Sequence, residues 1–473
     1  MFKKIIVLSF LISSLFAGES HSLHHLSAQD FNLYWLIPFI GILLSIALIP
    51  LIKSDFWHHH YGKVSAFWGI LFFICFAFNF WDYTLFYILE VYLREFLPFI
   101  MLLLALFTVS GGILITGNLN GTPILNLYII LIGTVLASIM GTTGASMLLI
   151  RPLIRANSWR KNKVHLIVFF IFLVSNVGGS LTPIGDPPLF LGFLRGVDFT
   201  WTLFNMYKPM IFVAVLLLIL FYIIDNYYYK KEYENRPKEE GFSIKIDGKI
   251  NFILIGIVVL AVIISGLENL KDWSFFTYHG TMMMSYGTLI QLIILLVVTL
   301  ISLKITPKKY RDGNDFTWEP ILEVAKLFAT IFLTMIPAIE MLKGVTKGIG
   351  PMSWMKNIII NNQGENIDYM YFWLTGILSS FLDNAPTYVV FFTTALGEQD
   401  VDWLMITGDT LLAISCGAVF MGAMTYIGNA PNFMVKSIAE ENKISMPSFF
   451  GYMIWSILIL IPILIVTSLI FFR

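Results

Sequence analysis

The sequence predicts an all-α polytopic membrane protein with about ten spans, built from two inverted repeats with re-entrant hairpins and broken helices. Three observations predict this fold: the composition, the apolar runs along the chain, and a motif that occurs twice. Of the 473 residues, 57% are hydrophobic and only 13% are charged. A soluble globular chain carries about 25% charged residues. The composition therefore excludes a soluble enzyme and a secreted disulfide scaffold.

The charge balance and the cysteines limit the partners. The chain has 30 basic and 30 acidic residues, so no overall attraction to nucleic acid is expected. Cys75 and Cys416 both lie inside apolar runs, where a thiol is typically a small buried side chain. The expected partner is the lipid bilayer, and no nucleic acid is expected to bind.

Residues 1–17 are predicted to be a secretory signal peptide. Lys3 and Lys4 precede an apolar run over 5–16, which small residues follow. This run is short for a spanning helix, which needs about 20 residues. An uncleaved membrane anchor is the alternative.

Eight apolar runs predict membrane helices, at 32–52, 64–81, 95–116, 208–224, 251–266, 284–303, 321–340 and 451–472. Two more apolar regions, 123–195 and 371–435, are interrupted by Gly, Pro, Asn and Asp. We predict a first transmembrane repeat over 30–224, a cytoplasmic linker over 225–250, and a second, inverted repeat over 251–473.

The basic residues predict which segments face the cytoplasm. Five segments hold 19 of the 30 Lys and Arg residues: 53–63, 151–165, 225–250, 304–320 and 436–450. Basic residues resist translocation, so these segments are expected inside. The spans satisfy this only if each interrupted region contains a re-entrant hairpin. The first hairpin then enters from the cytoplasmic side and the second from the outer side.

An internal repeat lies within the interrupted regions. Residues 179–190 match residues 422–433 at six of twelve positions without a gap. A second interrupted block precedes each, at 141–146 and 382–387. Aligning the blocks matches Asp186 with Asn429 and Asp383 with Thr142. Inverted repeats with broken helices near the membrane midplane are typical of secondary transporters.

Asp186 and Asp383 lie at the helix breaks, and neither block contains Lys or Arg. A carboxylate inside a membrane is costly unless a proton, a cation or a basic partner neutralises it. We predict that both are titratable carboxylates of a cation site, although simple capping of the broken helices is the alternative. Neutral oxygens of the kind Na⁺ prefers are expected from Asn384, Thr387, Asn429, Thr182, Thr425, Thr142, Thr143 and Ser146. The predicted Na⁺ ligands are Asp186, Asp383, Asn384 and Asn429.

Three segments, 178–194, 382–388 and 426–433, resemble the NhaD-type sodium/proton antiporters of the ion-transporter superfamily. The resemblance runs from about residue 30 to the end. It implies exchange of Na⁺ or Li⁺ for H⁺ by alternating access, in a homodimer, in the inner membrane of a bacterium. These ions would be transported rather than serve as cofactors. The same superfamily includes carriers of dicarboxylates, citrate and arsenite, so a proton- or sodium-coupled carrier of a small anion is the alternative function.

Other candidates depend on weaker patterns. Glu90 and Glu95 flank the entry to the run at 95–116, so each is a candidate proton relay or an interfacial acid at a helix start. Glu323 and Lys326 are expected to form a pair within one helix. The sequence contains no zinc-protease, serine-hydrolase or P-loop motif, so we expect a protein that is not an enzyme.

Overall fold

The apolar runs form helices in the computed structural model of the chain, which describes residues 25–232, 243–397 and 399–473. Eight of the described helices are long and apolar enough to cross a membrane, or up to ten if each of two bent helix pairs forms one span. The all-α polytopic membrane fold is thus confirmed. The predicted signal peptide, residues 1–17, lies outside the described residues.

The first repeat opens with the helices η1 (Leu33–Leu36), α2 (Ile37–Ile52), α3 (Ser54–Asn79), α4 (Trp81–Glu90), η2 (Val91–Phe96) and α5 (Leu97–Ser110). Helix α2 packs on α3, and α3 packs on α4. Helices α4, η2 and α5 form one continuous helix in which η2 is a π-helical segment. Such segments are frequent at functional sites because they shift the direction of the side chains.

The first interrupted region folds as a hairpin followed by a broken helix. The hairpin consists of α6 (Pro123–Met140) and α7 (Thr142–Ala156), which pack against each other. The broken helix consists of α8 (Val164–Leu173), η3 (Val177–Leu181) and α9 (Pro187–Leu194), and α10 (Trp201–Lys231) follows. Helix α10 continues past residue 225, where the linker was predicted to begin.

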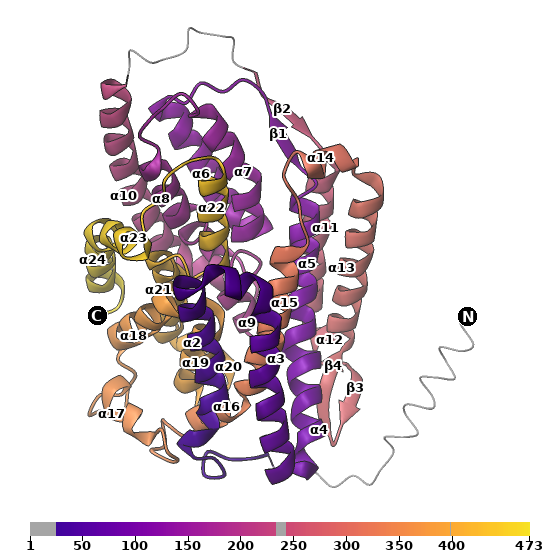
Figure 1. Cartoon of the computed structure of the whole chain (residues 1–473). Helices are drawn as coiled ribbons and strands as arrows, with labels where there is room; N and C mark the ends of the chain where they lie inside the picture. Colours follow the sequence, from indigo (N-terminus) through magenta and orange to yellow (C-terminus); the bar gives the residue numbers. More distant parts are fainter. Residues whose placement is uncertain (1–24, 233–242, 398) are drawn as a thin grey trace.

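The second interrupted region repeats this arrangement. Its hairpin consists of α18 (Asp368–Phe381) and α19 (Asn384–Leu396), and its broken helix of α20 (Val401–Thr407), α21 (Asp409–Met421), η6 (Gly422–Met424) and α22 (Ala430–Glu441). The chain ends in α23 (Phe449–Trp455), η7 (Ser456–Leu460) and α24 (Ile461–Phe471). In Figure 1, α6 and α7 lie in the upper half and α18 and α19 in the lower half. The two hairpins therefore enter from opposite ends, as inverted repeats require.

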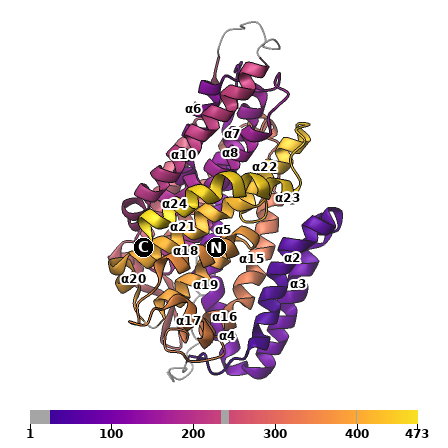
Figure 2. The ribbon, with the colours of Figure 1, turned by 90° about the vertical axis from the view of Figure 1, so that its left-hand side faces the viewer.

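The remaining helices are α11 (Ile250–Ser265), α12 (Glu268–Lys271), α13 (Tyr286–Ile305), α14 (Lys308–Asp312), α15 (Glu319–Thr334), α16 (Ile336–Lys343), η5 (Ser353–Met355) and α17 (Lys356–Ile359). Helix α5 packs on α11 and α13, and α15 packs on α2 and α3. Figure 2 shows α2 and α3 together at one side of the molecule, next to α15. We call η1 to α5, α11, α13 and α15 the frame, and α6 to α9 with α18 to α22 the hairpin core.

Two short strand pairs accompany the helices. Strand β1 (Leu114–Thr116) pairs antiparallel with β2 (Lys245–Asp247), and β3 (Ser274–Tyr278) pairs with β4 (Thr281–Ser285). The first pair fastens the end of the linker to the frame, directly after α5.

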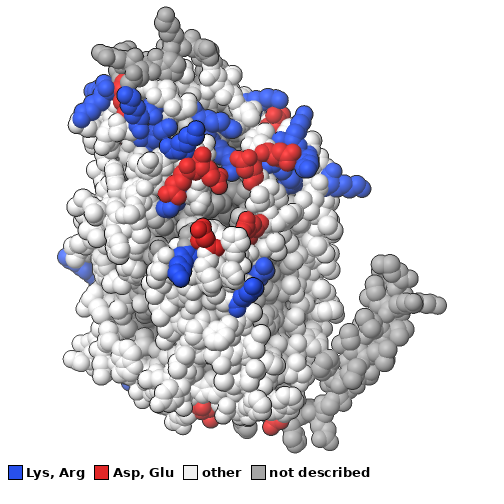
Figure 3. All heavy atoms as spheres, viewed as in Figure 1, with Lys and Arg blue, Asp and Glu red and all other residues white. Residues whose placement is uncertain are grey.

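The charged side chains distinguish the two ends of the molecule. Figure 3 shows Lys and Arg side chains gathered toward the upper end, where α10 ends and α14 lies in Figure 1. Because basic residues accumulate on the cytoplasmic side of membrane proteins, we call this the cytoplasmic end.

Candidate functional site

The carboxylate of Asp186 lies where the two hairpins meet. Its Oδ1 accepts hydrogen bonds from the Thr142 hydroxyl (2.9 Å) and the Asn429 amide (3.0 Å). Its Oδ2 accepts one from the Asn384 amide at 2.6 Å. The side chain is buried, with 1% exposed, and makes no ion pair among the described residues. Four of the predicted site residues, two from each repeat, are thus in direct contact.

The helix is interrupted at Asp186 because Pro187 and Pro188, which follow it, have no backbone N–H groups. They can begin the helix α9, but they cannot donate hydrogen bonds to carbonyl groups of a preceding turn. Close backbone packing stabilises each break. A Cβ atom on Gly185 would lie 2.1 Å from the carbonyl oxygen of Gly179, and one on Gly428 would lie 2.6 Å from that of Gly422. The glycines that match in sequence therefore allow the same close approach in both repeats.

Thr182 and Thr425 support the breaks and do not contact the carboxylate. The Thr182 hydroxyl donates to the carbonyl of Ser138, and the Thr425 hydroxyl donates to the carbonyl of Ser380. These equivalent bonds join each loop to the hairpin of its own repeat.

The hairpin tips correspond differently from the sequence alignment. The N–H of Thr142 donates to the carbonyl of Gly185 at 2.8 Å, and the N–H of Asn384 donates to that of Gly428 at 3.2 Å. The structural equivalent of Thr142 is therefore Asn384. The predicted match of Thr142 with Asp383 was wrong by one residue, because the tips share too few side chains to fix the register.

Asn384 has one unpaired atom. Its amide nitrogen donates to Asp186, but its Oδ1 is buried and has no hydrogen-bond partner among the described residues. Buried polar atoms are almost always paired, so an exception indicates a missing ligand or a functional strain. An amide oxygen beside a carboxylate is a donor set that a hard cation such as Na⁺ prefers.

Asp383 has a different environment from Asp186. Its Oδ1 accepts the N–H of Ala385 at 3.0 Å and so caps α19. The capping alternative therefore holds for Asp383. Asp186 makes no such bond to the helix α9 that it precedes.

Asp383 also lines a cavity of about 480 Å³ between the frame and the hairpin core. Charged residues of this lining are mostly acidic: Asp315, Glu319, Glu323, Asp383 and Glu441, with Arg151 as the basic one. Figure 3 shows a hollow below the cytoplasmic end, with acidic side chains around it. Such a surface attracts cations.

A smaller cavity of about 80 Å³ reaches Asp186, Thr142 and Thr143. The two cavities share five lining residues: Phe107, Pro320, Val324, Ala430 and Met434. The larger cavity lies near Arg151 and Asp315, in segments that the basic residues assign to the cytoplasm. The site is thus approached from the cytoplasmic end.

Other predicted residues lie away from the carboxylate of Asp186. The Thr387 hydroxyl donates to the carbonyl of Asp383 in its own helix, and the Ser146 hydroxyl bonds that of Ser175. Glu90 pairs with Arg94 at 3.0 Å and Glu95 with Arg195 at 2.7 Å. A relay role for either acid stays a prediction.

Glu323 does not form the predicted pair with Lys326. Its Oε1 accepts the indole N–H of Trp57 at 2.8 Å, while the Lys326 ammonium lies 5.0 Å from the centre of the Tyr61 ring. Packing of α3 on α15 provides both partners, and neither is visible from spacing within one helix.

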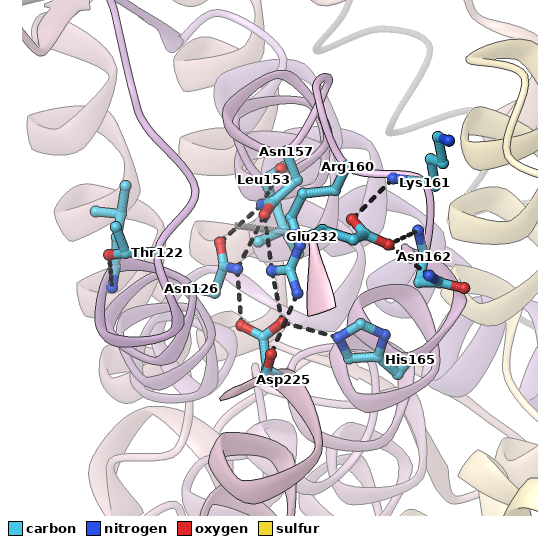
Figure 4. A network of polar contacts seen from close by, with 11 residues as sticks. Thr122, Asn126, Leu153, Asn157, Arg160, Lys161, Asn162, His165, Asp225 and Glu232 are labelled. Atoms are coloured by element: carbon cyan, nitrogen blue, oxygen red, sulfur yellow. Dashed lines mark hydrogen bonds and ion pairs between the residues drawn. The ribbon is translucent and has the colours of Figure 1, made fainter. Parts of the chain in front are cut away.

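A buried ionic network near the cytoplasmic end was not predicted from the sequence. Arg160 Nη1 lies 2.6 Å from Asp225 Oδ1, and both side chains are fully buried. Figure 4 shows Arg160, His165 and Asn126 pointing toward this carboxylate. The network joins α10 to α6 and to the loop after α7. The one available signal was an acid at the end of the apolar run 208–224.

Asn176 of the first repeat and Asn432 of the second extend the site beyond Asn429. The Asn429 amide lies 3.1 Å from Asn176 Oδ1, and the Asn176 amide donates to Asn432 Oδ1 at 2.7 Å. Asn432 belongs to the repeated motif but replaces Leu189 of the first copy, so comparing the copies could have identified it.

Comparison with known proteins agrees with a transport site. No curated protein matches the chain. A family described as "Putative citrate transport" matches residues 28–472, almost the whole chain. This match supports an ion-transporter-type family but not the NhaD type specifically, and it favours the anion-carrier alternative over sodium/proton exchange. The chain is a multi-pass membrane protein that belongs to the family described as putative citrate transport.

Proposed function

We propose that this protein is a secondary transporter that carries a small anion of the citrate type, coupled to Na⁺ or H⁺ at Asp186. The family match supports the anion. One observation supports a coupling ion: the buried carboxylate of Asp186 lies beside Asn384, whose amide oxygen has no hydrogen-bond partner among the described residues.

The free-energy cost of burying the Asp186 carboxylate favours binding of a coupling ion. Its three hydrogen-bond donors are neutral. Moving a carboxylate from water into a protein interior costs several kcal/mol, which neutral donors offset only in part. A proton or Na⁺ removes that cost. Arrival and departure of the ion therefore change the stability of this packing.

Helix direction supports binding of an anion beside the coupling ion. Four helices, α7, α9, α19 and α22, begin within the four interrupted blocks around Asp186, one in each block. The N-terminus of a helix carries a partial positive charge and free N–H groups, which favour carboxylates. Once a cation has neutralised Asp186, these helix ends favour a carboxylate of the substrate.

A second candidate function is exchange of Na⁺ or Li⁺ for H⁺ without an anion. The acidic lining of the large cavity favours it, because five carboxylates against one arginine attract cations and repel citrate. The same two acids, Asp186 and Asp383, would then carry the exchange.

Purified protein in liposomes distinguishes the two functions. Uptake of labelled citrate is measured under an inward Na⁺ gradient and, separately, an inward proton gradient. Gradient-dependent uptake that disappears in Asp186→Asn, but persists in the control Asp402→Asn, an exposed acid outside both cavities, supports the anion carrier. Proton movement driven by Na⁺ or Li⁺ in the absence of citrate supports the exchanger and contradicts the first proposal.

The assembly and location are also proposals. The family resemblance supports a homodimer in the inner membrane of a bacterium. We propose that this homodimer needs no cofactor and that Na⁺ or Li⁺ and H⁺ are transported ions. The mass of the detergent-solubilised protein tests the dimer, since a monomer at working concentrations would contradict it.

A further inference from the structure

Arg195 and Glu95 form an ion pair between the hairpin core and the frame. Arg195 follows α9, and Glu95 belongs to the π-helical segment η2. Arg195 Nη2 lies 2.7 Å from Glu95 Oε1, with 16% and 17% of the two side chains exposed. Helix α9 also packs on η2 and α5, so the pair lies within a contact between the two parts.

The pair lies on the outer side of the Asp186 site. Helix α9 starts directly after Asp186 and leads away from α8, which follows the cytoplasmic loop. Arg195 comes nine residues after Asp186, a rise of about 13 Å along a helix. Neither Glu95 nor Arg195 lines the two cavities that reach the site from the cytoplasmic end.

Each partner keeps one buried atom without a hydrogen bond, namely Glu95 Oε2 and Arg195 Nε. A half-satisfied pair of this kind contributes little to the stability of a static fold. Separating the partners, however, leaves two charges that need water. The contact is therefore stable while α9 lies against η2, and it dissociates only when water reaches it.

The cytoplasmic side has a contrasting ion pair. Arg151 of α7 contacts Asp315, which precedes α15, through Nε at 3.1 Å, and the Asp315 side chain is 73% exposed. Both residues line the open cavity. With its large cavity at the cytoplasmic end, the structure corresponds to an inward-facing state of the proposed transporter, in which the outer contact between core and frame is enclosed while the inner one is open to water.

We propose that the Glu95–Arg195 ion pair is an outer latch, which holds the transporter in the inward-facing state and opens when the site turns outward. This inference rests on transport by alternating access but not on the identity of the substrate. It assigns Glu95 a conformational role in place of a proton relay.

The latch is tested by measuring how accessible the cytoplasmic cavity is. In a Cys75→Ser background, where the remaining Cys416 is buried, Ser437→Cys supplies a reporter in the cavity lining. Inside-out vesicles are treated with a membrane-impermeant maleimide, and the labelling rate is followed. Glu95→Gln and Arg195→Gln should each slow labelling at least about threefold, because losing the pair shifts the population away from the inward-facing state.

Two further variants make the test specific. Exchanging the charges, with Glu95→Arg and Arg195→Glu together, should restore the labelling rate toward that of the parent. Glu90→Gln is the matched control, since Glu90 pairs with Arg94 within one helix, and its labelling rate should not change.

Unchanged labelling in both single variants, with thermal melting like that of the parent, would overturn the latch. So would a charge exchange that melts normally but labels as slowly as the single variants. These readouts need no substrate. A negative citrate assay would therefore contradict the proposed function and leave the latch standing.

Discussion

Thr142 and Asn384 begin the helices α7 and α19 at the tips of opposed hairpins, and both donate a hydrogen bond to the carboxylate of Asp186. They occupy equivalent positions in the two repeats, because the N–H of each bonds the carbonyl of a matched glycine. One carboxylate thus joins both hairpins. Displacing either hairpin relative to the other must break one of these bonds.

Asp186→Asn should abolish coupled transport. The variant keeps the shape of the side chain but removes the charge to which we propose that the coupling ion binds. Removing one partner of a buried charge pair costs about 3–5 kcal/mol, which corresponds to at least about a 100-fold loss of cation affinity. Transport by Asp186→Asn that keeps its Na⁺ and pH dependence in liposomes would contradict the assignment.

Asn384→Ala should weaken cation binding while the protein stays folded. It removes the unpaired Oδ1 and a hydrogen bond to a charged group, which is worth about 1.5–3 kcal/mol. The Na⁺ concentration for half-maximal transport should rise about tenfold or more. The matched control is Thr394→Val in the same helix, because the Thr394 hydroxyl bonds only a carbonyl of its own helix. An equal effect in both variants would indicate a general disturbance of α19.

Gly185→Ala and Gly428→Ala should both destabilise the broken helices. The new Cβ atoms would lie 2.1 Å and 2.6 Å from backbone carbonyl oxygens, so the loops must move. Overpacking of this kind costs about 1–3 kcal/mol, and a lower melting temperature in detergent should accompany it. In the control Gly256→Ala, a Cβ atom meets nothing within 4 Å. Comparable melting of Gly185→Ala and Gly256→Ala would show that the close approach is unimportant.

Asp225→Asn should destabilise the protein more than any exposed charge change. It leaves the guanidinium of Arg160 buried without its counter-ion, at a cost of about 3–5 kcal/mol. Replacing both partners by apolar residues, with Arg160→Met and Asp225→Leu together, should cost less than the single change. Thermal melting measures both effects, with Asp315→Asn as the exposed control. A double variant that melts below Asp225→Asn would refute this explanation.

Hydropathy and motif repetition were sufficient to predict the membrane fold and the two hairpins. Four of the ten predicted site residues, Asp186, Thr142, Asn384 and Asn429, are in direct contact. An interrupted apolar run can be recognised by its proline and aspartate residues, because proline ends a helix and a lone acid cannot stay unpaired in lipid. The register of the hairpin tips was not predictable in the same way. Asp383 corresponds to Gly141, which has no side chain to compare.

Contacts between distant segments were also beyond the sequence. Trp57 and Glu323 are 266 positions apart, so neither residue indicates the other. Asp225 was assigned to the linker because hydropathy falls there, although its charge is compensated by Arg160 and the helix continues. Averaging over a window cannot distinguish a solvated acid from one that a distant arginine neutralises.

Asp186 and Asn429 occupy equivalent positions, and the amide of Asn429 lies 3.0 Å from the carboxylate of Asp186. A symmetric dimer of two identical single repeats would place the same residue at both positions. Two aspartates at that separation would repel each other or share a proton, whereas two asparagines would bring no charge. Two repeats within one chain, in contrast, can carry different residues at these positions. The single charge at the centre of this site therefore depends on the difference between the two repeats, and two identical half-length chains could not have formed it.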